Sequence, residues 1–184
     1  MGNKANYIFP ECFVDTNITK TLLYLDGVNH RHGCNNVLKG MKECKSAEKF
    51  AVGIIDDDKK KPADFQKFRI ITESEHLKLL KHEDRQHFLI VVCKAAEDFL
   101  IACVNELQLN MFDYGLPNTM EELKKITKNC DSDKNPQIKK LINAIRNSSE
   151  MSRLNRTITY LQEEQNNVSV DTLKLIFEGG MKTK

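Results

Sequence analysis

Three acidic residues in a row, Asp56-Asp57-Asp58, directly follow a nearly continuous apolar run. Alternate residues of an extended segment point to the same side, so the carboxylates of Asp56 and Asp58 are predicted to converge on one small volume. Like charges at such close range repel each other unless a cation neutralises them. Mg²⁺ is the natural cation for this arrangement, with Mn²⁺ as its substitute, because it prefers hard oxygen ligands and is often held by only one or two protein carboxylates.

Glu11 supplies a third acidic side chain shortly after the first apolar run, Tyr7-Ile8-Phe9. In open parallel sheets, ligands bind beyond the carboxyl ends of the strands. If the strands that precede Glu11 and Asp56 are neighbours in such a sheet, both side chains lie at the same edge. We therefore expect Glu11 to stand beside Asp56 and Asp58.

The elements that must position these residues are predicted from apolar runs and helical periodicity. Strands are expected at residues 7–9, from Val28, at 50–55 and at 88–93, and helices are expected after the first, second and fourth of them. The run at 50–55 has the character of a strand buried on both faces. Strands that alternate with helices imply right-handed crossovers, so the fold class is predicted as α/β with about four mainly parallel strands.

The strand signals stop after Tyr114-Gly115-Leu116-Pro117, and apolar stripes at helical spacing follow. These stripes include residues 123–126, 138–145, 154–161 and 173–177, and Asn135-Pro136 has the sequence of a helix start. We predict an α/β domain over residues 1–110 and a helical extension over 111–184 that packs on it.

Composition restricts the classes of partner and compartment. The 28 Lys and Arg residues against 26 Asp and Glu give a net charge of +2, which is too small for long-range attraction of a polyanion, so nucleic acid would have to be gripped locally. The six cysteines are scattered, which favours reduced thiols in a cytoplasm. No apolar run approaches membrane-spanning length, so we expect no membrane partner.

The order of these segments resembles the Toprim domain of topoisomerases, primases and OLD-type nucleases. Toprim domains tend to show a strand ending in Glu-Gly, a nearby Asp, a small-residue loop entering a second helix, and a strand ending in Asp-x-Asp. The matching segments here are Ile8-Phe9-Pro10-Glu11-Cys12 with Asp15, Gly33-Cys34-Asn35-Asn36-Val37, Ile54-Ile55-Asp56-Asp57-Asp58 and, as in small bacterial Toprim-like proteins, Glu97-Asp98-Phe99-Leu100. The chain departs from the pattern at Cys12, where the family prefers Gly.

The resemblance implies roles for individual residues. Asp56 and Asp58 would ligate Mg²⁺, Glu11 would be a further ligand or a general base, and Glu97 would help to hold a second metal ion. The run from Lys59 through Lys60 and Lys61 would meet the phosphates of DNA or RNA. The implied function is that of a nuclease in a bacterial defence or repair system, with a separately encoded ATPase as partner, as in OLD-type systems. A non-catalytic binding or regulatory module of the same fold is the alternative.

Simpler structural explanations stay open for each of these residues. The acidic run with its lysines is also typical of a solvated turn, and Asp15 is typical of an N-cap for the first helix. Glu97 would stabilise the start of its helix through the helix dipole. A zinc site at His30, His32 and Cys34 would require a fourth ligand, and no His or Cys pair at ligand spacing follows.

Overall fold

The computed structural model describes residues 2–45, 49–57 and 60–180. The helices and strands are, in chain order, β1 (Lys4–Ala5), β2 (Ile8–Pro10), α1 (Phe13–Leu22), β3 (Gly27–Val28), α2 (Cys34–Lys42), β4 (Ala51–Asp56), η2 (Ala63–Lys67), β5 (Phe68–Glu73), β6 (Leu77–His82), β7 (His87–Val92), α3 (Ala96–Glu106), η3 (Met111–Tyr114), α4 (Met120–Thr127), η4 (Cys130–Lys134), α5 (Pro136–Ala144), α6 (Ser149–Glu164), η5 (Gln165–Asn167) and α7 (Val170–Glu178).

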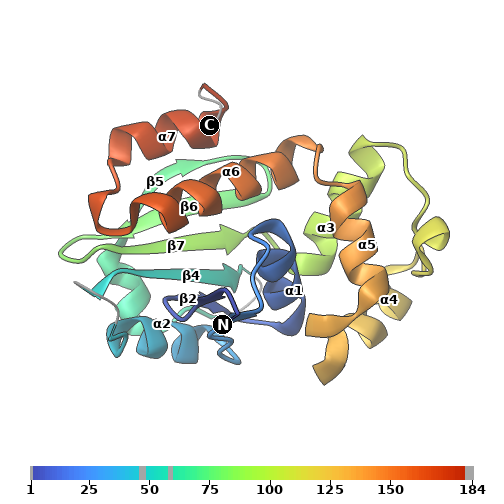
Figure 1. Cartoon of the computed structure of the whole chain (residues 1–184), viewed down its shortest axis with the longest axis horizontal. Coiled ribbons are helices and arrows are strands. Elements are labelled where there is room, and N and C mark those ends of the chain that lie inside the picture. Colours follow the sequence, from blue (N-terminus) through green and yellow to red (C-terminus); the bar gives the residue numbers. More distant parts are fainter. Residues whose placement is uncertain (1, 46–48, 58–59, 181–184) are drawn as a thin grey trace.

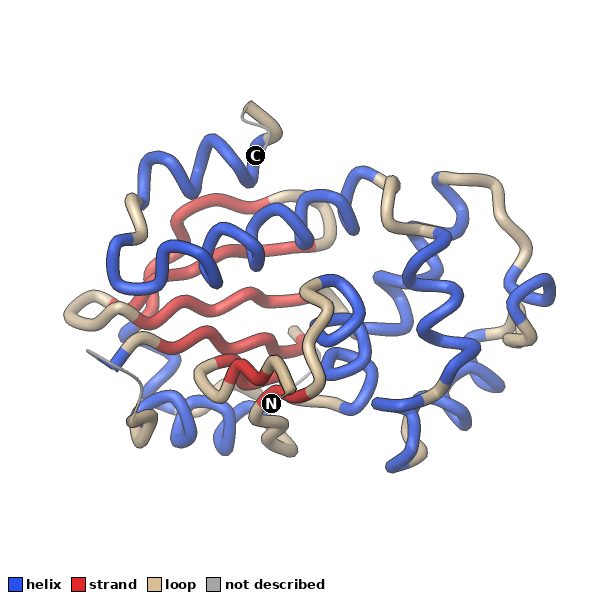
Figure 2. Tube along the Cα trace, viewed as in Figure 1, coloured by secondary structure: helices blue, strands red, loops and turns tan. Residues whose placement is uncertain are grey.

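The main sheet has five strands in the order β2-β4-β7-β6-β5 (Figures 1 and 2). The pairs β2/β4 and β4/β7 are parallel, whereas β7/β6 and β6/β5 are antiparallel. The class prediction, α/β, is confirmed, but the prediction of about four mainly parallel strands is wrong because the sheet is mixed. The strand expected at Val28 also lies elsewhere: β3 pairs with β1 in a separate two-stranded sheet.

The two antiparallel strands, β5 and β6, were not among the predicted strands. β5 is one of the two edge strands of the sheet, and the exposure of Arg69 and Ile70 directly after the buried Phe68 breaks any alternation of buried apolar residues along it. A register shift between Ile70 and Thr72 further interrupts its alternation. An edge strand of this kind takes its structure from pairing with its neighbour more than from its own side chains.

The central strands β4 and β7 are buried on both faces, as predicted for the run at 50–55. One face of these strands packs under α1, α3 and α6 and contributes Val52, Ile54, Phe88, Ile90 and Val92 to the larger hydrophobic cluster. The other face packs on α2 and contributes Ala51, Ile55, Leu89 and Val91. By the same alternation, the side chain of Asp56 follows Val52 and Ile54 and lies on the face of α1 and α3.

The C-terminal helices bury the predicted apolar stripes and belong to the same core as the sheet. The buried members are Leu123, Ile138, Leu141, Ile142, Ile145, Leu154, Ile158, Leu161, Leu173, Ile176 and Phe177. α5 packs against α1, and α6 runs across the sheet on the side seen in Figure 1. Pro136 begins α5, as predicted. Within the described ranges, no helix is long and apolar enough to span a membrane.

Gly53 in the centre of β4 permits the close approach of α2. A Cβ atom at this position would lie 2.5 Å from Leu89 Cδ2 and 2.7 Å from Met41 Sδ. Gly53→Ala is therefore expected to lower the free energy of unfolding by about 1–3 kcal/mol through overpacking. The matched control is Gly27→Ala, whose new Cβ would meet only Lys4 side-chain atoms at 3.5 Å or more. Urea denaturation measures both, and equal stabilities of the two variants would contradict the packing argument.

Candidate metal centre

The carboxyl ends of β2 and β4 bring Glu11 and Asp56 together. These strands are adjacent and parallel, with Pro10 opposite Ile54. The Glu11 backbone N–H donates to the Ile54 carbonyl at 2.9 Å, and the Asp56 backbone N–H donates to Glu11 Oε2 at 3.1 Å. Both side chains are buried, with Glu11 1% and Asp56 7% exposed. Glu11 and Asp56 thus lie at one edge of the sheet, but among the described residues the ligand atoms that converge do not include those of Glu11, and Asp58, the third expected acid, lies outside these residues.

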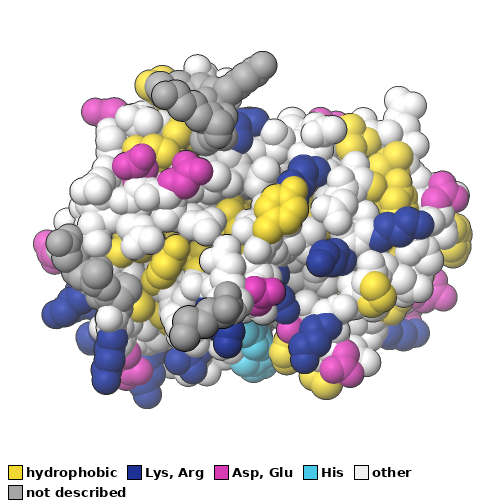
Figure 3. Space-filling view, in the orientation of Figure 1, with side chains coloured by type: hydrophobic (Ala, Val, Ile, Leu, Met, Phe, Trp, Pro, Cys, Tyr) yellow, Lys and Arg dark blue, Asp and Glu magenta, His cyan; other side chains and the backbone are white. Residues whose placement is uncertain are grey.

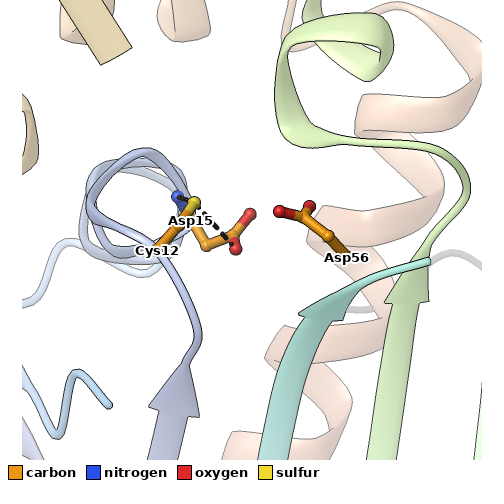
Figure 4. A group of neighbouring side chains, drawn as sticks. All are labelled: Cys12, Asp15 and Asp56. Carbon is orange, nitrogen blue, oxygen red and sulfur yellow. Dashed lines mark hydrogen bonds between the residues drawn. The ribbon is translucent and has the colours of Figure 1, made fainter. Parts of the chain in front are cut away.

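Asp15 joins them from the first turn of α1. The N-cap of this helix is Cys12, whose Sγ accepts from the Asp15 backbone N–H at 3.3 Å, so the interpretation of Asp15 as the N-cap is wrong. The Cys12 thiol also donates to Asp15 Oδ2 at 3.0 Å. The Asp15 and Asp56 carboxylates face each other (Figure 4). Asp15 Oδ1 is buried and has no hydrogen-bond partner among the described residues.

The ligand atoms in this group are close enough for one ion. One atom from each of Cys12, Asp15 and Asp56 lies within 4.8 Å of the others. Among the described residues, this is the one group of three or more His, Cys, Asp or Glu side chains that converges in this way. His30, His32 and Cys34 do not converge, so the structure offers no support for zinc there; the His30 ring stacks on Phe13 with centroids 4.4 Å apart.

The electrostatics of the group favour a bound cation. Burial raises the pKa of Asp15 to about 7. The hydrogen bonds from Cys12 lower this pKa, and the negative charges of Glu11 and Glu97 raise it. Burial, followed by the charges of Asp15 and Asp56, raises the pKa of the Cys12 thiol well above its ordinary value. Each additional negative charge is therefore unfavourable in this volume, and a metal ion would remove the penalty.

A pocket of about 480 Å³ opens beside these acids. Its lining consists of Cys12, Phe13, Val14, His32, Asp56, Ala95, Glu97, Lys124, Thr127 and Lys128. Glu97 lies in the first turn of α3, as expected, and its Oε1 accepts a hydrogen bond from the Thr127 hydroxyl of α4. The pocket thus joins the sheet edge to a helix of the C-terminal extension.

The remaining predicted site residues have varied locations. Asp58 and Lys59 lie outside the described residues. Lys60 is exposed, whereas Lys61 donates to the Asp56 carbonyl and forms an ion pair with Asp57 at 3.6 Å. Asp57 is exposed and also pairs with Lys78 at 3.0 Å. The solvated-turn interpretation therefore fits Asp57, but not the buried Asp56.

Sequence reasoning did not assign Asp15, Cys12, Lys124 and Lys128 to a common site. One local signal was present for the first pair: Cys12 and Asp15 have the spacing of an N-cap and its N3 residue, the positions linked in a capping box. That spacing places Asp15 in the first turn of the helix, with its side chain next to that of the N-cap residue. No comparable signal exists for the lysines, because they reach the pocket only through the packing of α4 on α3.

No protein-family model matches the chain, and comparisons with curated proteins and with solved structures find no match. Fold and site together define a mixed α/β protein with a cluster of buried carboxylates, Glu11, Asp15 and Asp56, near the carboxyl ends of two parallel strands.

Proposed function

We propose that the pocket beside Glu11, Asp15 and Asp56 binds Mg²⁺ or Mn²⁺, and that the protein is a metal-dependent enzyme of nucleic-acid phosphodiester hydrolysis. The observation that carries this proposal is the pair of buried carboxylates, Asp15 and Asp56, facing each other with Asp15 Oδ1 lacking a hydrogen-bond partner among the described residues. Buried charge without compensation is unfavourable, and metal coordination is one of the few ways in which proteins compensate it.

The donor set fits a hard divalent cation. Asp15 and Asp56 would be its ligands, and Glu97, which lines the same pocket as Asp56, would hold further metal-bound water. When bound, such an ion supplies charge neutralisation at a phosphoryl group and lowers the pKa of bound water. Glu11 is held by the Asp56 backbone N–H, so its carboxylate is fixed beside the site as a ligand or base. The thiol of Cys12 supports Asp15.

The Toprim-like order of acidic residues supports the same proposal. Two members of that pattern, Glu11 and Asp56, are joined across β2 and β4 by a hydrogen bond, and the pattern's Asp15 converges with Asp56. The nuclease activity, a role in bacterial defence or repair and an ATPase partner rest on this resemblance.

A non-catalytic, metal-binding regulatory module is the second candidate. It is favoured by the charge distribution: the net charge is +2, and Lys and Arg are interspersed with Asp and Glu on the face seen in Figure 3. A nuclease that binds long nucleic acids would gain more from a continuous basic surface.

Two measurements on the purified protein test the proposal. If Mg²⁺ or Mn²⁺ is present at about 100 times its Kd, binding should add roughly 2.7 kcal/mol to the free energy of unfolding, or about 5–10 °C in Tm. Labelled single- and double-stranded DNA and RNA should be cleaved in either metal and remain intact in a chelator. Metal-dependent stabilisation without cleavage would favour the regulatory module. A Tm that responds to neither metal would contradict both candidates.

A further inference from the structure

The pocket beside the carboxylates is also lined by two lysines. Lys124 lies in α4, and Lys128 is the C-cap of the same helix. Residues four apart lie on the same side of a helix, so both can reach one volume. Both side chains line the pocket that Asp56 and Glu97 also line.

Neither lysine is neutralised by a neighbouring carboxylate. Lys124 and Lys128 form no ion pair with any residue in the described ranges, although both share a pocket with two acids. Lys125, between them in the sequence, does pair, with Glu121 at 3.2 Å. The pocket, of about 480 Å³, is therefore lined by both carboxylates and lysines that do not pair with one another among the described residues.

α4 is fixed next to Glu97 by specific contacts. Leu123 is fully buried in the core, and Thr127 is 3% exposed and donates its hydroxyl hydrogen bond to Glu97. Lys124 directly follows Leu123, and Lys128 directly follows Thr127. The backbone of both lysines is therefore held at a defined place relative to Glu97. This arrangement is preorganised, which is what a binding site for a charged group requires.

We infer that Lys124 and Lys128 form a phosphate subsite, which binds the phosphate group that a metal ion held by the carboxylates also contacts. The inference rests on the proposed function and names its substrate contacts. A metal–phosphate unit carries both a cation and anionic oxygens, which matches a pocket lined by both carboxylates and lysines. Lysine is a common phosphate ligand that acts as a point charge. The volume is that of a small-ligand pocket, so the subsite takes one nucleotide of a single strand or strand end.

The test compares the double variant Lys124→Gln/Lys128→Gln with Lys125→Gln, which removes a charge from the same helix outside the pocket. The probe is a short, fluorescently labelled single-stranded oligonucleotide with phosphorothioate linkages, which slow cleavage, titrated in Mg²⁺ at several salt concentrations. We expect the double variant to bind at least about tenfold more weakly, with a salt slope lower by roughly 0.7, since one neutralised phosphate on a single strand contributes about 0.7. Lys125→Gln should remain within about twofold of wild type.

A second readout separates this inference from the proposed function. The metal-induced rise in Tm should be the same in the double variant and in wild type, because the lysines are not metal ligands. Unchanged oligonucleotide affinity and salt slope in the double variant, with the metal response intact, would overturn the phosphate subsite and leave the metal site standing. A wild-type protein that binds the oligonucleotide through these lysines without any metal response would instead overturn the proposed function.

Discussion

Asp56→Asn is expected to abolish the metal-induced rise in Tm and to lower cleavage at least about 100-fold. Asp56 ends β4, is buried, and faces Asp15 across the group of converging ligand atoms. Asn keeps the size of the side chain but removes the negative charge that would hold the cation. A loss of 100-fold corresponds to about 2.7 kcal/mol of transition-state stabilisation, which is within the several kcal/mol that a metal ion supplies.

The next residue provides a matched control. Asp57→Asn makes the same chemical change one position along, but Asp57 is exposed and engaged by Lys61 and Lys78. We expect Asp57→Asn to retain the metal response and to cleave within about twofold of wild type. Equal losses in the two variants would show that the carboxylates at this edge act only through general charge, and the metal site would have to be abandoned. Circular dichroism of both variants excludes unfolding as the cause.

Asp15→Asn is expected to stabilise the metal-free protein at neutral and alkaline pH, while removing its metal response. The carboxyl pKa of Asp15 is raised from 3.8 to about 7 in the folded chain, chiefly by burial. A shift of this size means that ionisation of Asp15 lowers the free energy of unfolding by roughly 4 kcal/mol. Asn occupies the same volume without charge and can still accept from the Cys12 thiol. The site would thus be a case in which function costs stability.

The sign of the pH dependence follows from where the proton is held. Between about pH 3.8 and 7 the folded chain retains the Asp15 proton more often than the unfolded chain does, so the wild-type free energy of unfolding falls as pH rises through this window. Buried His87 acts in the opposite direction, because its pKa is lowered from 6.5 to about 4, mainly by burial. The quantity to compare is therefore the difference between Asp15→Asn and wild type, in which the His87 contribution cancels.

Denaturant unfolding in a chelator, at pH steps from acid to mildly alkaline, measures this difference. The advantage of Asp15→Asn should be small near pH 4 and should approach roughly 4 kcal/mol above pH 7. Mg²⁺ should stabilise the wild type more strongly as pH rises, because binding requires the ionised carboxylate. A variant that is less stable than wild type at every pH would mean that the carboxylate is satisfied in the folded protein, and the argument from an uncompensated charge would fail.

Several features could be predicted because their signals are local. The runs that became β4 and β7 are apolar enough to identify central strands, and the C-terminal stripes such as Ile138, Leu141 and Ile142 identify helices by their spacing. The meeting of Glu11 and Asp56 followed from one further rule, that parallel neighbours present their carboxyl ends at a common edge.

Other features could not be predicted because their cause lies in distant contacts. The hairpin of β5 and β6 forms by pairing onto β7. The residues of β5 are mostly exposed, so their own sequence does not predict a strand. The same limit applies to Lys124 and Lys128, which contact the pocket only because α4 packs on α3.

Local sequence alone established which residues could form strands, helices and an acidic edge, since hydrophobic periodicity and side-chain charge act over a few residues. Tertiary structure decided which charges were removed from water and which faced each other. Asp56 and Asp57 are chemically identical neighbours, yet one is buried opposite Asp15 and the other is exposed beside two lysines. Successive residues of a strand point to opposite faces, and only the face of Asp56 is covered here by α1 and α3. Burial therefore depends on how the helices pack on the sheet, which the local sequence does not specify.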